Sequence, residues 1–264
     1  MNIEKRRKKL KVDWPNIQES RFVQLNEIDW HVQIMGEGED VLLLHGTGSA
    51  THSWSGLSAE LVSNYRLVML DLPGHGMTGC QNNQCFTLPA MAREISFLLS
   101  SLDVDPRWVV GHSAGAAILA QMCLEKTIHP NALISINGAL KPFGQSAAYI
   151  FSQAARFLAR RKFMSYLISL HSISLKTTER MIRATGSHTV ETTLHHYRRL
   201  VGTPGHVNAA LKMMAGWDLE DLDRRLEQLT PPLFLVTCLN DQTVSPSQAA
   251  ALSQRLPNSI LKKV

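Results

Sequence analysis

The stretch from Val109 to Gly115 reads Val-Val-Gly-His-Ser-Ala-Gly, and of all parts of this chain it says most about the fold. Ser113 stands between two glycines, after an apolar run typical of a buried strand and before a helical pattern over 114–126. A G-x-S-x-G sequence between a strand and a helix is typical of a nucleophile elbow, because only glycines let the two elements pass closely at so sharp a turn. The turn would hold the hydroxyl at a helix N-terminus, where backbone N–H groups stabilise an anion. We therefore predict that Ser113 is a nucleophile.

Short apolar runs alternate with helical patterns on both sides of this motif. Runs typical of strands buried on both faces occur at residues 41–44, 67–70, 108–110, 132–136 and 233–236. Two alternating strands, 20–25 and 28–34, precede them, and another strand begins at 260. Helical patterns occur at 54–63, 88–102, 114–126 and 246–256. This order predicts an α/β fold with a mostly parallel, doubly wound sheet.

The alternation stops between residues 141 and 217, where the pattern is helical throughout. Helices are predicted at residues 147–162, 163–172, 177–185, 189–201 and 204–217. An all-helical insertion after one strand of a sheet is typical of a cap. We predict a basic N-terminal tail at 1–13, a core made of 14–140 and 218–264, and a helical cap at 141–217.

The formal net charge of +5 is distributed unevenly along the chain. Residues 141–217 carry eleven basic and two acidic side chains, and residues 1–11 carry six basic and one acidic, whereas residues 12–140 sum to −8. Basic segments suit an anionic partner such as a membrane surface, an acidic protein or a carboxylated ligand. The alternative is that these side chains only solvate helix faces. We expect no nucleic-acid partner.

Basic and aromatic side chains are interleaved in the first two predicted cap helices. The basic ones are Arg156, Arg160, Arg161 and Lys162. This mixture would suit a large, flat apolar ligand with carboxylates, or an anionic membrane, although most of the apolar side chains are expected to pack the cap against the core. Elsewhere in the cap, His188, His195, His196 and Tyr197 are expected to be exposed or packed, and not to act as ligands.

An oxyanion hole is predicted from the loop Leu44-His45-Gly46-Thr47-Gly48, which follows the first buried strand. Two backbone N–H groups must converge on the developing alkoxide, and we assign them to Thr47 and Ala114. His45 and His75 are expected to be structural. A metal site made of His45, His75 and Asp71 is the alternative, but their spacing resembles no zinc motif. We expect neither a metal nor a cofactor.

Asp241 follows the predicted strand 233–236 and occupies the acid position, because the order Ser, Asp, His is that of α/β-hydrolases. The alternative is a loop aspartate that caps a helix. Asn137, at the end of the preceding strand, cannot ionise and leaves the other acid position vacant. No histidine follows Asp241. We expect the base to lie beyond residue 264 in a longer protein; a chain that naturally lacks it is the alternative.

The four cysteines are Cys80, Cys85, Cys123 and Cys238. Their spacing resembles no zinc motif, and we expect reduced thiols, with a small Cys80–Cys85 ring as the alternative. No secretory signal and no apolar run of about 18 residues is apparent. We therefore expect a protein of the cytoplasm, free or peripherally bound to a membrane.

Several motifs together resemble one group within the α/β-hydrolase fold. They are Trp14-Pro15-Asn16, Trp30-His31-Val32-Gln33, Thr51-His52-Ser53-Trp54, Asp71–Gly76, Gly111–Ile118, Asn137-Gly138-Ala139-Leu140, Pro204-Gly205-His206-Val207 and Trp217-Asp218-Leu219. From Trp14 onward the chain is similar to the magnesium-chelatase accessory proteins of bacteriochlorophyll-synthesising bacteria (the BchO family). The resemblance implies a role in magnesium insertion into protoporphyrin or in handling a nearby tetrapyrrole, with a magnesium-chelatase subunit as a partner. Cys238 departs from this group, whose loops usually carry glycine there.

Three functions compete at this stage. The first is hydrolysis of an ester-like bond through Ser113, which the combination of Ser113, Ala114, Thr47 and Asp241 favours. The second is a non-catalytic module that binds a tetrapyrrole or a chelatase subunit on the same fold, which the absence of a histidine after Asp241 favours. The third is a general carboxylesterase outside pigment metabolism.

Overall fold

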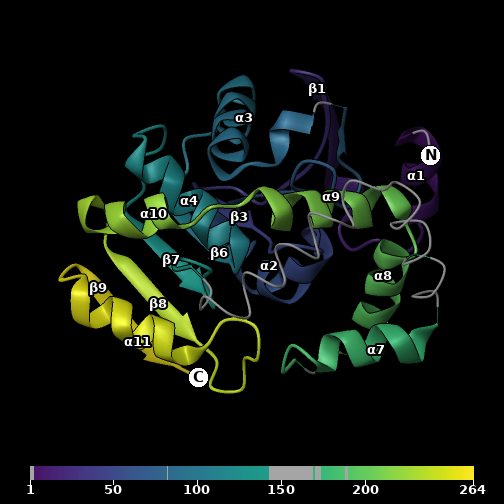
Figure 1. The fold of residues 1–264 in the computed structure, drawn as a ribbon. Coiled ribbons are helices and arrows are strands. Elements are labelled where there is room, and N and C mark those ends of the chain that lie inside the picture. The colour runs from purple at the N-terminus through teal and green to yellow at the C-terminus, as the bar shows by residue number, and fades with distance from the viewer. Residues whose placement is uncertain (1–2, 82, 143–168, 170–173, 188–189) are drawn as a thin grey trace.

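The computed structural model describes residues 3–81, 83–142, 169, 174–187 and 190–264 of the chain (Figure 1). Nine strands in these residues form one sheet in the order β1-β2-β4-β3-β6-β7-β8-β9, and β5 pairs with β2. The strands are β1 (Ser20–Leu25), β2 (Ile28–Met35), β3 (Glu39–Leu44), β4 (Tyr65–Leu70), β5 (Gly79–Cys80), β6 (Trp108–His112), β7 (Ala132–Ile136), β8 (Leu233–Thr237) and β9 (Ser259–Lys263). Every strand that the sequence predicted is present.

Most neighbours in the sheet run parallel, as predicted. The pairs β4–β3, β3–β6, β6–β7, β7–β8 and β8–β9 are parallel, while β1–β2 and β2–β4 are antiparallel. Asn26 and Glu27 both have positive φ, of 51° and 62°, in the two-residue turn between β1 and β2. Two left-handed residues are what a tight hairpin between right-twisted strands requires.

The helices cover both faces of the sheet. They are α1 (Ile3–Leu10), α2 (Ser55–Leu61), α3 (Leu88–Ser101), α4 (Ala114–Leu124), α7 (Leu175–Arg183), α8 (Glu191–Val201), α9 (Pro204–Gly216), α10 (Glu220–Arg225) and α11 (Pro246–Arg255), with 3-10 turns η1 (Ile17–Glu19), η2 (Thr51–Trp54), η3 (Asn83–Phe86) and η4 (Leu226–Gln228). Leu42 and Leu44 join the core beneath α3 and α4, whereas Leu43 joins a second cluster with Trp54 at the start of α2. Because successive strand side chains point to opposite faces, a strand covered on both faces must be apolar throughout.

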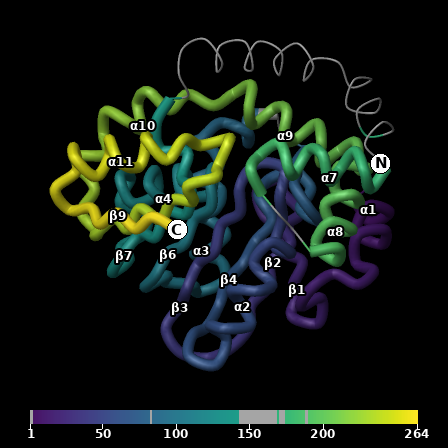
Figure 2. Tube along the Cα trace, turned by 90° about the horizontal axis from the view of Figure 1, so that it is seen from below, coloured from purple at the N-terminus to yellow at the C-terminus, as the bar shows by residue number. Residues whose placement is uncertain are grey.

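The described part of the predicted cap consists of α7, α8 and α9, close to the helices predicted at 177–185, 189–201 and 204–217. In both views α8 lies beside α1 and continues into α9 (Figures 1 and 2). The helices predicted at 147–162 and 163–172, which include Arg156, Arg160, Arg161 and Lys162, lie outside the described residues, as does His188. No helix in the described ranges is long and apolar enough to cross a membrane.

The basic N-terminal segment folds as α1 and packs against the core. Leu10 is completely buried. Arg6 donates to the Gly74 carbonyl at 2.7 Å, and Arg7 donates to the Met77 carbonyl at 3.1 Å. Burial lowers the pKa of Arg6 to about 10. Two of the six basic side chains therefore stabilise the interior of the protein, a role that the charge pattern did not predict.

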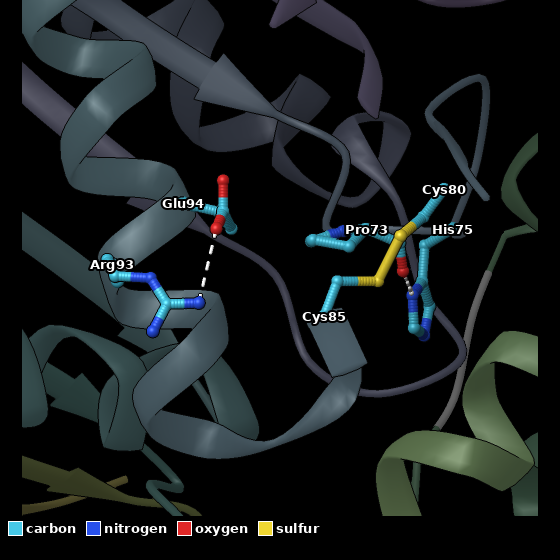
Figure 3. Close-up of a disulfide and its surroundings, with 6 residues drawn as sticks. All are labelled: Pro73, His75, Cys80, Cys85, Arg93 and Glu94. Carbon is cyan, nitrogen blue, oxygen red and sulfur yellow. Dashed lines mark hydrogen bonds and ion pairs between the residues drawn. A yellow bond between two sulfur atoms is a disulfide. The ribbon is translucent and has the colours of Figure 1, made fainter. Parts of the chain in front are cut away.

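Cys80 and Cys85 form a disulfide, so the prediction of reduced thiols for this pair is wrong (Figure 3). Cys80 ends β5, which pairs with β2, and η3 then turns the chain back so that buried Cys85 faces it. Only this reversal brings the two sulfur atoms together, and composition alone cannot predict it. The neighbouring Phe86 ring lies against Gly74 and under the Lys212 ammonium of α9, at 5.1 Å.

Thiol titration checks this pairing. Without reductant, the denatured chain is expected to show two thiols, Cys123 and Cys238, and four after reduction. In the native protein Cys238 should react first, because Cys123 is buried and burial raises its pKa to about 12. A Cys80→Ser/Cys85→Ser variant should show two thiols under both conditions. Four thiols in the unreduced wild type would show that Cys80 and Cys85 are reduced, as the sequence predicted.

Candidate active site

Ser113 sits on a strained turn at the carboxyl end of β6. Its φ of 52° and ψ of −115° place a non-glycine residue in the left-handed half of conformational space, which costs on the order of 1–3 kcal/mol. A Cβ on Gly111 would lie 2.3 Å from the Ala116 nitrogen, and one on Gly115 would lie 2.0 Å from the Leu44 oxygen. The flanking glycines are therefore a steric requirement, as the motif predicted. Among the described residues the Ser113 hydroxyl has no hydrogen-bond partner.

The loop with Thr47 lies directly against this elbow. A Cβ on Gly46 would lie 3.0 Å from the Ser113 Cβ. Thr47 follows β3, whose neighbour is β6, so both residues stand at the carboxyl edge of the parallel strands. Within the described residues the backbone N–H groups of Thr47 and Ala114 have no intramolecular acceptor. Two unpaired N–H groups beside Ser113 are the arrangement that an oxyanion hole needs.

Asp241 follows β8, on the same edge of the sheet but separated from β6 by β7. Its carboxylate accepts hydrogen bonds from the N–H groups of Thr243, at 2.6 Å, and Val244, at 2.9 Å. These bonds fit the loop-capping alternative and are compatible with an acid role. No hydrogen bond joins Asp241 to Ser113 in the described chain. Burial lowers the pKa of His112, which precedes Ser113, while the charge of Asp241 opposes that shift.

Neighbouring segments brace the Asp241 loop. Asn137, in the position predicted to lack an acid, accepts the Cys238 N–H with its side-chain oxygen at 2.7 Å. The cap reaches the same loop: Gln242 N–H donates to the Thr185 carbonyl at 3.0 Å, and Asn240 donates to the Gly186 carbonyl at 2.9 Å. The turn after α7 therefore holds the loop that carries Asp241.

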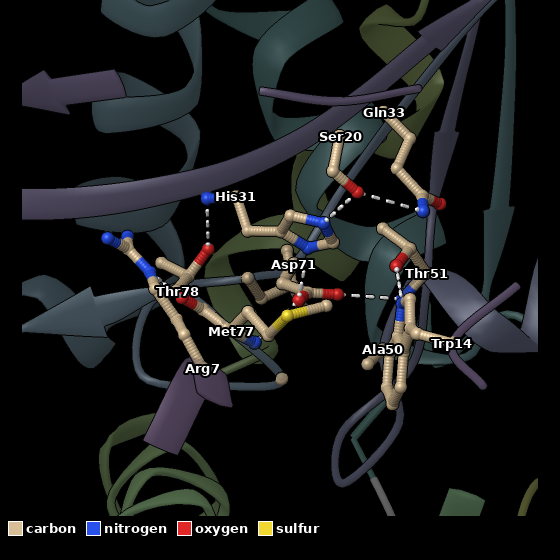
Figure 4. A network of polar contacts seen from close by, with 12 residues as sticks. Arg7, Trp14, Ser20, His31, Gln33, Ala50, Thr51, Asp71, Met77 and Thr78 are labelled. Atoms are coloured by element: carbon tan, nitrogen blue, oxygen red, sulfur yellow. Dashed lines mark hydrogen bonds and ion pairs between the residues drawn. The ribbon is translucent and has the colours of Figure 1, made fainter. Parts of the chain in front are cut away.

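Asp71 is a buried carboxylate with three hydrogen-bond donors (Figure 4). It lies 2.7 Å from the His31 Nδ1 and accepts the N–H groups of Thr51 and Met77, each at 2.7 Å. Burial by itself raises the pKa of Asp71, but His31 and the Met77 N–H outweigh it and hold that pKa well below its usual range. The described residues contain no group of three or more side chains arranged to hold a metal ion.

His45 ties two loops together through both ring nitrogens, as predicted. Its Nδ1 donates to the Gly46 carbonyl at 2.8 Å, and its Nε2 accepts the Leu72 N–H at 3.0 Å. His75 is also buried, with Nδ1 donating to the Pro73 carbonyl at 3.1 Å.

Sequence reasoning missed two cap residues that reach this region. The Thr47 hydroxyl donates to the sulfur of Met213 at 3.4 Å, and the His206 ring contacts both Gly48 and Gly76. Met213 and His206 lie in α9. The motifs Pro204–Val207 and Met213-Met214, which belong to the resemblance, contain both residues, but no role was predicted for either side chain.

A family model described as the alpha/beta hydrolase fold matches residues 41–264. The chain belongs to the α/β-hydrolase family. A magnesium-chelatase 30 kDa subunit from Rhodobacter capsulatus is 33% identical, over 97% of this chain and 90% of that protein. A pimeloyl-[acyl-carrier protein] methyl ester esterase from Aeromonas salmonicida is 28% identical, over 86% of this chain and 87% of that protein. An α/β-hydrolase fold protein from Burkholderia ambifaria superimposes with a TM-score of 0.75 at 19% identity, over 92% of this chain and 89% of that one.

This α/β-hydrolase is therefore related both to a magnesium-chelatase subunit and to esterases. The predicted fold and the predicted resemblance are confirmed. The roles of Ser113, Asp241, Thr47 and Ala114 remain predictions, which their placement at one edge of the sheet supports.

Stability measurements on Gly115 check the elbow geometry. Gly115→Ala should destabilise the fold by about 2–3 kcal/mol, because the added methyl group would overlap the backbone of Leu44. Gly56→Ala is the matched control: Gly56 lies in α2 with nothing within 4 Å of the added Cβ, and alanine should stabilise this helix by about 0.5–1 kcal/mol. Equal unfolding midpoints in urea for the two variants would contradict the close approach.

Asp71→Asn should destabilise the protein by about 1–3 kcal/mol, because an amide group cannot accept all three of the buried hydrogen bonds that the carboxylate accepts. The pKa of Asp71 is depressed in the folded state, so its contribution is present above about pH 4 and is lost as the pH falls. Urea unfolding between pH 3 and 7 should show this loss in the wild type and not in the variant. Asp105→Asn, at a side chain 74% exposed, should stay within about 0.5 kcal/mol of the wild type. An equally small effect of Asp71→Asn would refute the role of the Asp71 hydrogen bonds in stability.

Proposed function

We propose that this chain hydrolyses an ester-like bond of a tetrapyrrole intermediate and acts alongside magnesium chelatase in bacteriochlorophyll synthesis. One observation carries the hydrolytic part: Ser113 is held in a left-handed conformation beside two unpaired N–H groups. The relation to a magnesium-chelatase subunit supports the pathway, and the relation to a methyl ester esterase supports the bond type.

In this mechanism Ser113 Oγ forms a bond to the ester carbonyl carbon while its proton passes to a histidine base, the triad member that does not follow Asp241 in this sequence. The carbonyl oxygen becomes an oxyanion that accepts hydrogen bonds from the N–H groups of Thr47 and Ala114. The alkoxide then leaves and takes the proton from the base, which gives an acyl-Ser113. Water, deprotonated by the same base, releases the acid and restores the hydroxyl. Asp241 orients the base and stabilises its protonated form.

A second candidate is a binding module that holds a tetrapyrrole or a chelatase subunit without chemistry. The eleven basic side chains of residues 141–217 favour it, because they suit a carboxylated ligand. The same charges favour the cytoplasmic face of an anionic membrane as a peripheral site. A general carboxylesterase would use the same residues on another ester.

Rescue by imidazole separates these functions. No histidine follows Asp241 in this sequence, and loss of a triad histidine typically costs on the order of 10⁶ in turnover. The chain should therefore hydrolyse p-nitrophenyl esters very slowly, and added imidazole should raise the rate beyond its effect in free solution. Ser113→Ala should abolish the increase, whereas Ser63→Ala, at an exposed serine, should keep it.

The remaining outcomes assign the alternatives. Rapid hydrolysis without imidazole that disappears in Ser113→Ala would place the base within these residues, with His112→Ala as the variant to follow. No Ser113-dependent hydrolysis, together with protoporphyrin binding that Ser113→Ala leaves unchanged, would refute the enzyme and support the binding module.

A further inference from the structure

His206 is a buried cap residue that bridges two loops of the core. It lies in α9 and is 1% exposed. Its Nε2 is 3.1 Å from the Gly48 carbonyl oxygen, and its Nδ1 is 3.1 Å from the Gly76 nitrogen. A carbonyl only accepts and an amide N–H only donates, so Nε2 carries the proton and Nδ1 is bare. These two bonds require one tautomer of the neutral imidazole.

His45 makes the same kind of bridge between the same two loops, 45–48 and 72–76. It donates to the Gly46 carbonyl and accepts from the Leu72 N–H. The His75 ring lies between the two bridges, 5.6 Å from the His45 ring and 5.2 Å from the His206 ring. His45 belongs to the core, whereas His206 comes from the cap. The predicted oxyanion loop, residues 45–48, is therefore hydrogen-bonded to one histidine of the core and to one histidine of the cap. The second of these contacts depends on the position of α9.

The cap contacts the oxyanion loop at two consecutive residues. Met213 accepts the Thr47 hydroxyl, and His206 binds the Gly48 carbonyl. The two cap residues are seven positions apart, so they share one face of α9. Gly48 has a φ of 76° and nothing within 4 Å of a Cβ built on it. Among the described residues, His206 is the only donor to the Gly48 carbonyl.

We propose that His206 is a positioning residue: as a neutral imidazole on the cap, it sets the conformation of Gly48 and thereby aims the neighbouring Thr47 N–H at the oxyanion. The site is then assembled only when α9 is docked. This inference rests on the proposed hydrolytic function for its catalytic consequence, but the docking of α9 can be measured separately.

The environment of His206 opposes its protonation. His75 faces it from the loop 71–76, Arg6 from α1, and His45 from the end of β3. Burial, then His75 and Arg6, lower the pKa of His206 well below its ordinary value, and the Gly48 carbonyl only partly offsets them. Protonation would also put a second donor on the ring, facing the Gly76 N–H. Since the pKa is lowered in the docked state, docking is favoured above about pH 6.5 and weakens below it, by up to tenfold per pH unit for this one group.

Two substitutions separate the two hydrogen bonds. In His206→Gln the amide nitrogen comes near the position of Nε2, so the bond to Gly48 can persist without a titrating group. In His206→Asn the amide oxygen comes near the position of Nδ1, so the bond to Gly76 can persist while the bond to Gly48 is lost. His129→Gln, at an exposed histidine, is the matched control.

Hydrogen exchange of the segments 45–50 and 72–77 between pH 5 and 8 is the first measurement. His206→Asn should speed exchange in 45–50 about tenfold or more at pH 7.5. His206→Gln should keep the wild-type exchange rate in segment 45–50 at pH 7.5. Below about pH 6.5, exchange in the wild type should rise because one group, His206, is protonated, and this rise should be absent in His206→Gln. The second measurement is acylation of Ser113 by a p-nitrophenyl ester with imidazole. His206→Asn should slow the acylation step about 10–100-fold with little change in KM, and His206→Gln should stay within about threefold of the wild type.

The two measurements test the hydrolytic function and the positioning role of His206 independently. If no protein shows Ser113-dependent acylation, the hydrolytic function is wrong, and the exchange data still decide whether His206 holds the loop. Equal exchange in the Asn, Gln and wild-type proteins at every pH would overturn the positioning role. A purely structural role would lower the stability of both variants alike, with no difference between them in segment 45–50.

Discussion

The buried carboxylate of Asp71 is the interaction on which the arrangement of the site depends. It joins the His31 imidazole of β2, the Thr51 N–H at the start of η2 and the Met77 N–H of its own loop. A charge with no exposure to water is stable only when donors surround it, and here donors from three separate segments do so. Gly76 permits this closure, since a Cβ there would lie 2.1 Å from the carboxylate. The loop 71–77 is thus held in one conformation.

That loop is in turn the support for the histidines around the site. His45 accepts the Leu72 N–H, His206 accepts the Gly76 N–H, and Arg6 of α1 donates to the Gly74 carbonyl. Core, cap and N-terminal helix therefore meet at one rigid turn. Burial lowers the pKa of His75 and of His52 to about 3, so these two imidazoles are neutral at physiological pH. Acid weakens this junction, because protonation would put a charge on a buried imidazole.

The second constraint is steric and belongs to the elbow. Gly115 lies so close to Leu44 that α4 can begin only where it does, directly above the end of β3. This contact puts the Ser113 hydroxyl next to the loop that carries Thr47. Ser113 and the loop that carries Thr47 are thus adjacent for the same reason that the strand and the helix cross closely.

The sequence by itself determined the order of strands, the helices described between residues 175 and 216, the elbow at Ser113 and the edge of the sheet where Thr47, Ala114 and Asp241 stand. These features follow from local patterns: apolar periodicity, and glycines where no side chain fits. Only the tertiary structure decided the packing of α1, the disulfide between Cys80 and Cys85, the three donors to Asp71 and the bridge made by His206. The bonds of His206 join residues 130 and 158 positions apart, and their strength depends on burial and on which ring nitrogen carries the proton. A local sequence pattern cannot predict the burial of His206 or which of its ring nitrogens carries the proton. Both are decided only when segments distant in the sequence pack together.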